Sequence, residues 1–271
     1  MDLTVIVVSW NTAPLLAGCL RAIPEAAGEL IHRIIVVDNG SSDGTAELVA
    51  RDFPHVRLIR NASNVGFAKG NNQGMREPES QGTRYVLLLN SDTFPDPGSL
   101  SSLVKFLDQH VDAGAVGPKL VSGDGIPQAY AFGRDPSPEY LLIRMAKRFF
   151  LHRSMHDWAT DTIQEVDWVS GACLMVRRQA IDQIGLLDEN FFMFFEDNDW
   201  CVRMRKQGWK IYFNPWVSVL HYGGQGLAQA PSAYKSYYHS LNHFYEKHYG
   251  RLARLLLRVG YGVFLKGHGD G

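Results

Sequence analysis

The chain has 271 residues, of which 45% are hydrophobic and 20% are charged. These proportions are typical of a globular protein and exclude collagen-like, disordered and disulfide-scaffold chains. Because 27 lysines and arginines nearly balance 28 aspartates and glutamates, the overall charge gives no reason to expect a nucleic-acid partner. Any anionic ligand must therefore be held by a local site.

Three cysteines, Cys19, Cys173 and Cys201, lie far apart in the sequence. Their odd number and the lack of a CxxC pair indicate reduced thiols rather than a zinc site or disulfides. No secretory signal follows Met1, and no apolar run reaches the roughly 18–20 residues that a membrane span needs. The sequence predicts a cytoplasmic protein, either soluble or peripheral at the inner face of the plasma membrane.

The first part of the chain alternates short apolar runs with longer amphipathic segments. Strands are predicted at 4–8, 34–37, 56–60 and 85–89, and helices at 15–23, 45–52, 68–76 and 100–109. Continuous apolar strands separated by helices are typical of an α/β fold with a mostly parallel central sheet flanked by helices. In such sheets, ligands bind beyond the carboxyl ends of the strands.

The second part of the chain is less regular. We expect strands at 115–121, 166–176, 211–213 and 216–220, the second of them interrupted by Ser170-Gly171, and a helical tail from about residue 233. The glycine, proline and serine residues between 122 and 138 predict a mobile loop over the ligand-binding edge. The simplest division is one domain over 1–232 and a C-terminal helical appendage over 233–271.

Polar clusters follow three of the predicted strands: Ser9-Trp10-Asn11, Asp38-Asn39-Gly40 and Asn90-Ser91-Asp92. Parallel strands bring their carboxyl ends to one edge, so these clusters are expected to converge. Asp38 could accept a hydrogen bond from the imide N–H of a pyrimidine base or from a ribose hydroxyl. It could equally organise a turn, whereas Asp43 is better placed to cap the helix that follows.

Asp92 follows the most apolar of these strands, and a carboxylate there can hold Mg²⁺ or Mn²⁺ that bridges a diphosphate. A strand-end turn is the alternative. His221, after another predicted strand, is either a metal ligand or, more commonly, a structural histidine. Residues 64–74 form a glycine-rich segment that has neither GK[ST] nor GxGxxG spacing. This segment suits an anion at a helix start, or simply a tight turn.

Glu196, Asp197 and Asp199 lie close together behind an aromatic run. Acids this close repel one another, so at least one needs a cation or a raised pKa. A raised pKa suits a base that takes a proton from an alcohol. The alternatives are a helix whose first turn is rich in acids, or pairing with Arg203 and Arg205.

Several segments together resemble the inverting glycosyltransferases of family 2, which have the GT-A fold. SWN, GFAKGNNQG and FFEDNDWCVR look most like bacterial rhamnosyltransferases that use dTDP-L-rhamnose. Each segment is weak evidence by itself, but the set occurs in the family's order and is highly specific. The matching segments span about 220 residues: TVIVVSWN at 4–11, VVDNGSSDGT at 36–45, NVGFAKGNNQG at 64–74, LLLNSD at 87–92, WVSGACLMVRR at 168–178, DENFFMFFEDNDWCVRMRKQGW at 188–209 and HYGG at 221–224.

The resemblance implies that about 1–120 forms a nucleotide-binding half and about 121–232 an acceptor-side half. Asp38 would be the acid that binds the base or the ribose. Trp168 and Gly171 would lie near the acceptor. The nucleotide and donor side would be formed by Ser9, Asn11, Asp38, Asn64, Gly66, Lys69 and Asn90.

Asp92 matches the retained aspartate of the family's DXD metal motif, and His221 matches a histidine that ligates metal in some relatives. The implied cofactor is therefore Mg²⁺ or Mn²⁺. Asp197 would be the general base, with Glu196 orienting it or the acceptor. Asn90 departs from the pattern, since many relatives have an aspartate there, and this puts strict metal dependence in doubt. Many rhamnosyltransferase-like members share the asparagine, so it does not indicate an inactive protein.

The implied reaction is a single in-line displacement with inversion at the anomeric carbon. We expect transfer of L-rhamnose from dTDP-L-rhamnose to a saccharide, or to a polyprenyl-diphosphate-linked saccharide, in bacterial cell-wall or surface polysaccharide synthesis. The alternatives are a UDP-hexose-dependent transferase of the same family, a nucleotide-sugar-binding protein without catalysis, and a nucleotidyltransferase.

Two segments combine apolar bulk with basic residues. In 251–266, Arg251, Arg254 and Arg258 recur at helical spacing, and 140–153 has a similar character. A basic amphipathic helix is typical of an anionic membrane surface, although ordinary packing with solvated arginines explains the pattern equally well. Membrane contact would fit a polyprenyl-linked acceptor.

Overall fold

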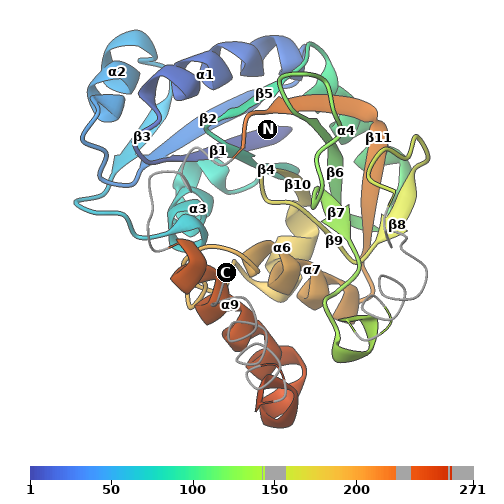
Figure 1. The fold of residues 1–271 in the computed structure, drawn as a ribbon. Coiled ribbons are helices and arrows are strands. Elements are labelled where there is room, and N and C mark those ends of the chain that lie inside the picture. Colours follow the sequence, from blue (N-terminus) through green and yellow to red (C-terminus); the bar gives the residue numbers. More distant parts are fainter. Residues whose placement is uncertain (142, 144–156, 224–232, 256, 258–271) are drawn as a thin grey trace.

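A computed structural model describes residues 1–141, 143, 157–223, 233–255 and 257. Within these residues, a nine-stranded sheet has the order β3-β2-β1-β4-β10-β6-β11-β5, with β8 paired to β11 (Figure 1). A two-stranded sheet, β7 with β9, lies beside it. The predicted α/β architecture is confirmed.

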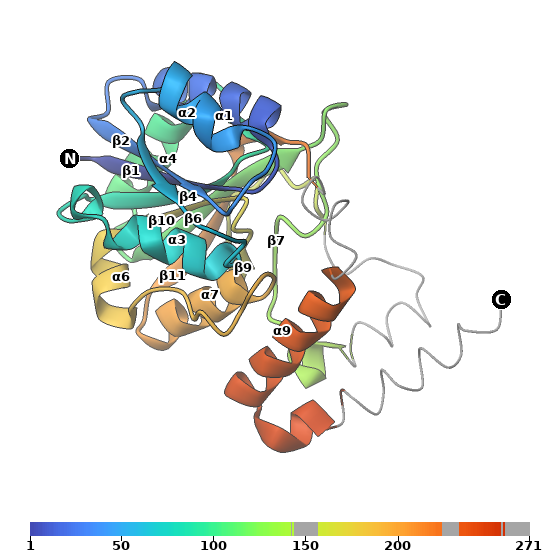
Figure 2. The ribbon, with the colours of Figure 1, turned by 90° about the vertical axis from the view of Figure 1, so that its left-hand side faces the viewer.

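The first half of the sheet is parallel. β1 (Leu3–Ser9) pairs with β2 (His32–Asp38) and with β4 (Tyr85–Asn90), and β3 (Arg57–Arg60) pairs with β2. One face is covered by α1 (Ala13–Ala27), α2 (Thr45–Asp52) and α4 (Ser99–Gln109). The opposite face is covered by α3 (Phe67–Arg76), α6 (Arg178–Ile184) and α7 (Glu196–Lys206), as Figure 2 shows from the side. A short 3₁₀ helix, η1 (Pro78–Ser80), links α3 to β4.

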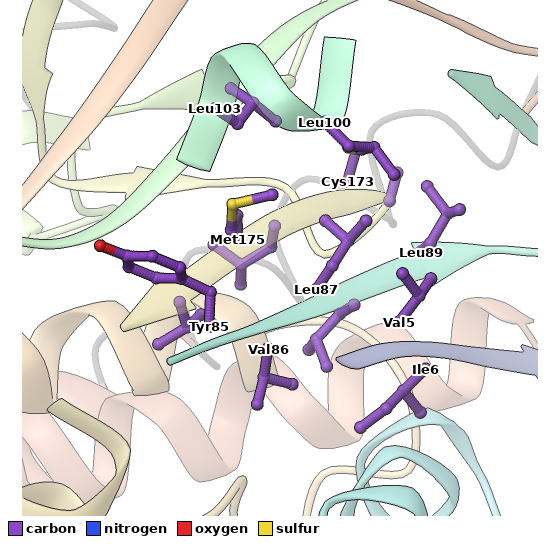
Figure 3. Packing of buried hydrophobic residues seen from close by; sticks show 14 of the residues in the cluster. Val5, Ile6, Tyr85, Val86, Leu87, Leu89, Leu100, Leu103, Cys173 and Met175 are labelled. Atoms are coloured by element: carbon purple, nitrogen blue, oxygen red, sulfur yellow. The ribbon is translucent and has the colours of Figure 1, made fainter. Parts of the chain in front are cut away.

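The apolar runs of β1 and β4 are explained by burial on both sides of the sheet. Figure 3 shows Val5 and Leu87 pointing toward α4, while Ile6 and Val86 point to the opposite face. All four side chains are fully buried. Because successive strand residues face opposite sides, a sheet covered on both faces needs apolar residues at every position.

The second half of the sheet is mixed. β10 (Cys173–Arg177) is antiparallel to both β4 and β6 (Ala113–Val121), while β11 (Lys210–His221) is parallel to β6. β5 (Thr93–Pro95) and β8 (Gln164–Val166) pair antiparallel with β11. β7 (Phe132–Gly133) and β9 (Trp168–Val169) form the small sheet.

Two predictions of strands need correction. The predicted interruption of 166–176 at Ser170-Gly171 is confirmed and separates β9 from β10. A second break at Asp167, which was not predicted, separates β8 from β9, and the three strands pair with different partners. The predicted strands 211–213 and 216–220 form one strand, β11, whose register against β6 shifts between Asn214 and Ser218. Pro215 lies within this shift, where a missing N–H donor is tolerated.

The C-terminal helix α9 (Ala233–His248) packs against the segment that leads into α7. The rings of Phe195 and Phe244 lie 5.6 Å apart between centroids. Asp199 is fully buried beneath α9, where Lys247 Nζ and His248 Nε2 each lie 2.8 Å from its carboxylate. Burial raises the pKa of Asp199, but the hydrogen bond from His248 and the charges of Arg203 and Lys247 hold it below its usual value.

The proposed boundary at residue 233 coincides with the start of α9, and the division of the chain into domain and appendage stays a prediction. Most of the basic segments at 140–153 and 251–266 falls outside the described residues. Among the helices of the described part, none is long and apolar enough to cross a membrane.

We expect the substitution Asp199→Asn to lower the free energy of unfolding by about 3 kcal/mol, because the partly buried Arg203 and Lys247 lose their fully buried counter-charge. Since folding depresses the pKa of Asp199, its contribution is present above about pH 4 and is lost as the pH falls through the lowered value. Urea unfolding at pH 7 and in acid should therefore show that the free energies of unfolding of the variant and the parent become equal as the pH falls.

The matched control is Asp182→Asn, which removes the i,i+4 partner of Arg178 at a side chain that is 61% exposed. This variant should lose no more than about 0.5 kcal/mol. Equal losses in the two variants would show that the buried cluster does not fasten α9.

Candidate active site

A cavity of about 810 Å³ lies at the carboxyl edge of the sheet. The strand registers pair Val8 with Asn90 and Ser9 with Asp38, so these strand ends are level with one another. The antiparallel strand β10 begins at the same edge, where Asn90 N donates to Ala172 O at 3.0 Å. The predicted site residues that line the cavity are Asn64, Gly66, Asn90, Asp92, Trp168, Gly171, Glu196, Asp197 and His221.

Asp197 is held at the cavity wall by backbone donors. Its Oδ2 accepts a hydrogen bond from Gly171 N at 2.9 Å, and its Oδ1 accepts one from Asn198 N at 2.8 Å. The chain enters α7 through Phe194 and Phe195, whose φ angles of 72° and 65° are left-handed. Such conformations cost about 1–3 kcal/mol each for residues with bulky side chains. This turn places Asp197 in the first turn of α7, facing the Ser170-Gly171 turn.

Burial raises the pKa of Asp197, and the N–H groups of Gly171 and Asn198 lower it part of the way back. Burial also raises the pKa of Glu196 well above its usual value, and the Asp197 carboxylate adds to this increase. Glu196 is 5% exposed, and its Oε2 is buried without a hydrogen-bond partner. The pair therefore favours an ionised Asp197 beside a protonated Glu196.

The third acid of this cluster points elsewhere. Asp199 does not line the cavity, and its Oδ2 accepts from Arg203 Nε at 2.9 Å, as one of the sequence alternatives predicted. Arg205 instead pairs with Asp135 and lies 3.6 Å from Asp167, so its predicted pairing with the cluster is wrong.

Asp92 and His221 meet at the end of β11. His221 Nε2 lies 3.4 Å from Asp92 Oδ1 and 3.4 Å from Asn90 Nδ2. The pairing of His221 with Thr93 sets this approach, and Tyr222 N donates to Asp92 O at 3.0 Å. A carboxylate oxygen suits Mg²⁺ or Mn²⁺, and an imidazole nitrogen is a ligand typical of transition-metal ions. The Asn90 amide presents its nitrogen to His221, and an amide nitrogen does not bind such a cation. Among the described residues, no group of three or more His, Cys, Asp or Glu side chains could hold a metal ion.

The glycine-rich segment leads into α3 and contributes Asn64, Gly66 and Phe67 to the cavity lining. Gly66 has a φ of 89°, and a Cβ at this position would lie 2.5 Å from Phe192 O. Phe67 N donates to the same oxygen at 2.7 Å, and Gly66 N donates to Asn64 Oδ1 at 2.9 Å. Gly66 therefore allows the loop before α7 to approach the start of α3.

Asp38 is buried behind the cavity lining and organises a turn. Its Oδ1 accepts from Ser41 N at 3.2 Å, which was the alternative to direct ligand contact. Its neighbour Asn39 lines the cavity and donates from Nδ2 to Gly66 O at 3.2 Å. Asn39 was overlooked, although it lies in the middle of a polar cluster that the sequence singled out.

Ser9, Asn11 and Lys69 also lie outside the cavity lining. The buried Ser9 hydroxyl hydrogen-bonds Thr12 Oγ1 at 2.9 Å, and Asn11 Oδ1 accepts from Ser42 N at 2.8 Å. Lys69 is exposed on α3. These residues brace the loops around the cavity or lie beside it, and their predicted nucleotide contacts stay predictions.

One wall of the cavity is aromatic, which the sequence reasoning missed apart from Trp168. The phenylalanine run before Glu196 could have indicated an aromatic lining, whereas nothing in the sequence indicated that α9 contributes to the cavity. The additional aromatic lining residues are Trp10, Phe67, Tyr130, Tyr140, Trp158, Phe192, Phe194, Phe195 and Tyr237.

Residues 2–239 match the sequence family described as glycosyltransferase like family 2. The chain belongs to this family. It is 30% identical to an N-acetylglucosaminyl-diphospho-decaprenol L-rhamnosyltransferase of Mycobacterium tuberculosis, over 92% of this chain and 85% of the relative. A dTDP-rhamnosyl transferase of Shigella flexneri is 23% identical over 69% of this chain and 59% of its own length.

A solved mannosyltransferase of Pyrobaculum calidifontis, in complex with GDP-mannose and Mn²⁺, has a TM-score of 0.59 at 19% identity. The similarity covers 90% of this family-2 glycosyltransferase and 61% of the mannosyltransferase chain. This likeness confirms the predicted GT-A fold.

We expect Gly66→Ala to lower the free energy of unfolding by about 2–3 kcal/mol, because the added Cβ collides with Phe192 O and the φ is left-handed. Gly44→Ala is the matched control, since Gly44 has a φ of 83° with nothing within 4 Å of an added Cβ. Its cost should be about 1 kcal/mol. Chemical denaturation of both variants measures the difference, and equal costs would contradict the close approach of the two loops.

Proposed function

We propose that this glycosyltransferase moves L-rhamnose from dTDP-L-rhamnose to a hydroxyl of a saccharide carried on a polyprenyl diphosphate, with inversion. The observation that carries the proposal is a half-buried Asp197, held by backbone donors, in the same cavity as Asp92 and His221. The similarity to a relative named as an L-rhamnosyltransferase of a lipid-linked N-acetylglucosamine supports the choice of donor and acceptor.

Asp197 acts as the general base. It accepts the proton of the acceptor hydroxyl, whose oxygen forms a bond to the anomeric carbon while the bond from that carbon to the diphosphate breaks. Its raised pKa makes it a stronger base than an exposed aspartate, and the N–H donors of Gly171 and Asn198 keep it ionised and oriented. A single displacement with no enzyme nucleophile inverts the anomeric centre.

Glu196 supports the base from the adjacent position. Its carboxyl group is buried and protonated, so it adds no second negative charge beside Asp197. Protonated, it is also able to donate a hydrogen bond to the acceptor sugar. Trp168 and Gly171 complete the acceptor side, with the Trp168 indole held in place by its bond to Arg134 O at 3.0 Å.

Asp92 and His221 would hold Mg²⁺ or Mn²⁺, with Asn90 beside them. When bound there, the cation supplies positive charge that offsets the charge developing on the departing diphosphate. Asn64 and Gly66 line the nucleotide side of the cavity. That side is surrounded by Ser9, Asn11, Asp38 and Lys69. Asp38 binds its own turn through Oδ1, so its other carboxylate oxygen, Oδ2, would accept the hydrogen bond from the base or the ribose.

The aromatic wall suits the acceptor. Tyr130 and Trp158 from the region after β6, together with Tyr237 from α9, offer flat apolar surfaces for a sugar or the first part of a lipid chain. Leu252 and Leu255, 71% and 57% exposed, follow α9 beside Arg251. This combination favours peripheral contact with an anionic membrane, where a polyprenyl-linked acceptor resides.

The donor and acceptor are tested together with a panel of dTDP-, UDP- and GDP-sugars, Mg²⁺ or Mn²⁺, and acidic phospholipid vesicles that carry polyprenyl-diphosphate N-acetylglucosamine. We expect transfer from dTDP-L-rhamnose, and a thermal shift with dTDP larger than with UDP or GDP. Free N-acetylglucosamine should be a poorer acceptor. Transfer from a UDP-hexose alone would refute the proposed donor, and equal use of the free sugar would refute the lipid-linked acceptor.

Asp197→Asn should lower the turnover number about 10²- to 10⁴-fold, because it removes the base, while dTDP still raises the melting temperature. Glu196→Gln should retain more activity, since an amide resembles the protonated acid. In the parent enzyme, the rate should fall on the acid side as the pH drops through the raised pKa of Asp197, above the usual value of about 3.9. Asp182→Asn, an exposed change on α6, is the control. An active Asp197→Asn variant with parental turnover would exclude this aspartate as the base.

A further inference from the structure

Gln128 contacts His221 from two sides. Gln128 Nε2 donates to His221 O at 2.7 Å, and Gln128 Oε1 lies 2.8 Å from His221 Nδ1. The backbone holds Gln128 in place, because Gln128 N donates to Leu120 O at 2.8 Å and Pro127 forms a bridge with Val121. The side chain is therefore anchored to the end of β6, next to the end of β11.

These two contacts determine which imidazole nitrogen carries the proton. A carbonyl oxygen only accepts hydrogen bonds, so the amide nitrogen of Gln128 must face His221 O. The amide oxygen then faces Nδ1, and an oxygen acceptor there requires a hydrogen on Nδ1. In the neutral ring, Nε2 consequently keeps its lone pair.

The lone pair points toward Asp92, the other predicted metal ligand, and toward the amide of Asn90. Nε2 lies 3.4 Å from Asp92 Oδ1 and 3.4 Å from Asn90 Nδ2, whose N–H can donate to the lone pair when no cation is bound. In the opposite tautomer, an Nε2–H would donate to the Asp92 carboxylate, so both groups would be occupied with each other. The choice of tautomer thus decides whether His221 and Asp92 compete or act together.

We propose that Gln128 is a positioning residue that fixes the Nδ1–H tautomer of His221 and so presents Nε2, with Asp92, to a divalent cation. The inference rests on the proposed metal role of these two residues. Outer partners of metal-binding histidines orient the ring in this way, and their removal weakens metal binding by about 10- to 100-fold.

The first test needs no variant. Long-range ¹H–¹⁵N spectra of protein labelled at its ten histidines report the tautomer of each ring, and His221→Ala identifies the His221 signals. At a pH where the ring is neutral, we expect the Nδ1–H pattern without metal. An Nε2–H pattern overturns the inference.

The second test measures Mn²⁺ affinity by electron paramagnetic resonance in the presence of dTDP. Gln128→Met preserves the length of the side chain but removes both hydrogen bonds, so affinity should fall about 10- to 100-fold. Gln128→Glu retains an acceptor for Nδ1–H and should lose less. Gln109→Met, at the exposed end of α4 away from the cavity, is the matched control and should bind like the parent.

Unchanged Mn²⁺ affinity in Gln128→Met overturns the inference, as does an equal loss in Gln109→Met. If the parent protein itself does not bind Mn²⁺ with dTDP, the metal site and this inference both fail. Sugar transfer is not measured in either test. A parent enzyme that binds Mn²⁺ but transfers no rhamnose would contradict the proposed function while leaving the role of Gln128 intact.

Discussion

The first turn of α7 joins two parts of the molecule. Residues two positions apart on a helix point in nearly opposite directions, so Asp197 faces the cavity while Asp199 faces α9. Gly171 N donates a hydrogen bond that holds Asp197 at the Ser170-Gly171 turn, and Asp199 contacts Lys247 and His248 of α9. Both contacts therefore act on the short turn that carries the proposed base, and α9 also contributes Tyr237 and Leu241 to the cavity lining.

This arrangement concentrates unfavourable features in one place. Two adjacent left-handed phenylalanines lead into the helix, and Glu196 buries a carboxyl oxygen without a partner. Such features persist only where the surrounding structure leaves no alternative. Here the constraint comes from the Gly66–Phe192 approach on one side and the packing of Phe195 against Phe244 on the other. These contacts hold the half-buried Asp197 beside the buried Glu196.

The opposite side of the cavity is built from neutral polar groups. Asn39 accepts from Asn61 Nδ2 at 2.9 Å and donates to Asn64 Oδ1 at 3.3 Å. Asn61 and Gln73 exchange hydrogen bonds at 2.8 and 2.9 Å. This amide network fixes the loops after β2 and β3 relative to α3 without adding charge. Under the proposed function, an anionic donor would meet its positive partner at the Asp92–His221 end, where the proposed cation would bind, rather than in these loops.

The sequence determined the parts of this protein that depend on local pattern. Fully apolar runs such as that of β4 require burial on both faces, so the layered α/β fold followed from them. The polar residues at strand ends indicated the edge that carries the site, because parallel strands end together, and the set of motifs indicated the glycosyltransferase family.

Tertiary structure decided what depends on contacts between distant segments. Asp199 has a local partner in Arg203, four positions later on the same helix, but only the packing of α9 adds Lys247 and His248 to it while Asp197 lines the cavity. The single strand β11 looked like two, because Pro215 interrupts the pattern while pairing with β6 continues beyond it. The role proposed for Gln128 could not be predicted from the sequence. Its partner His221 lies 93 positions away, and the function of an amide side chain depends on which atoms it hydrogen-bonds in the folded protein.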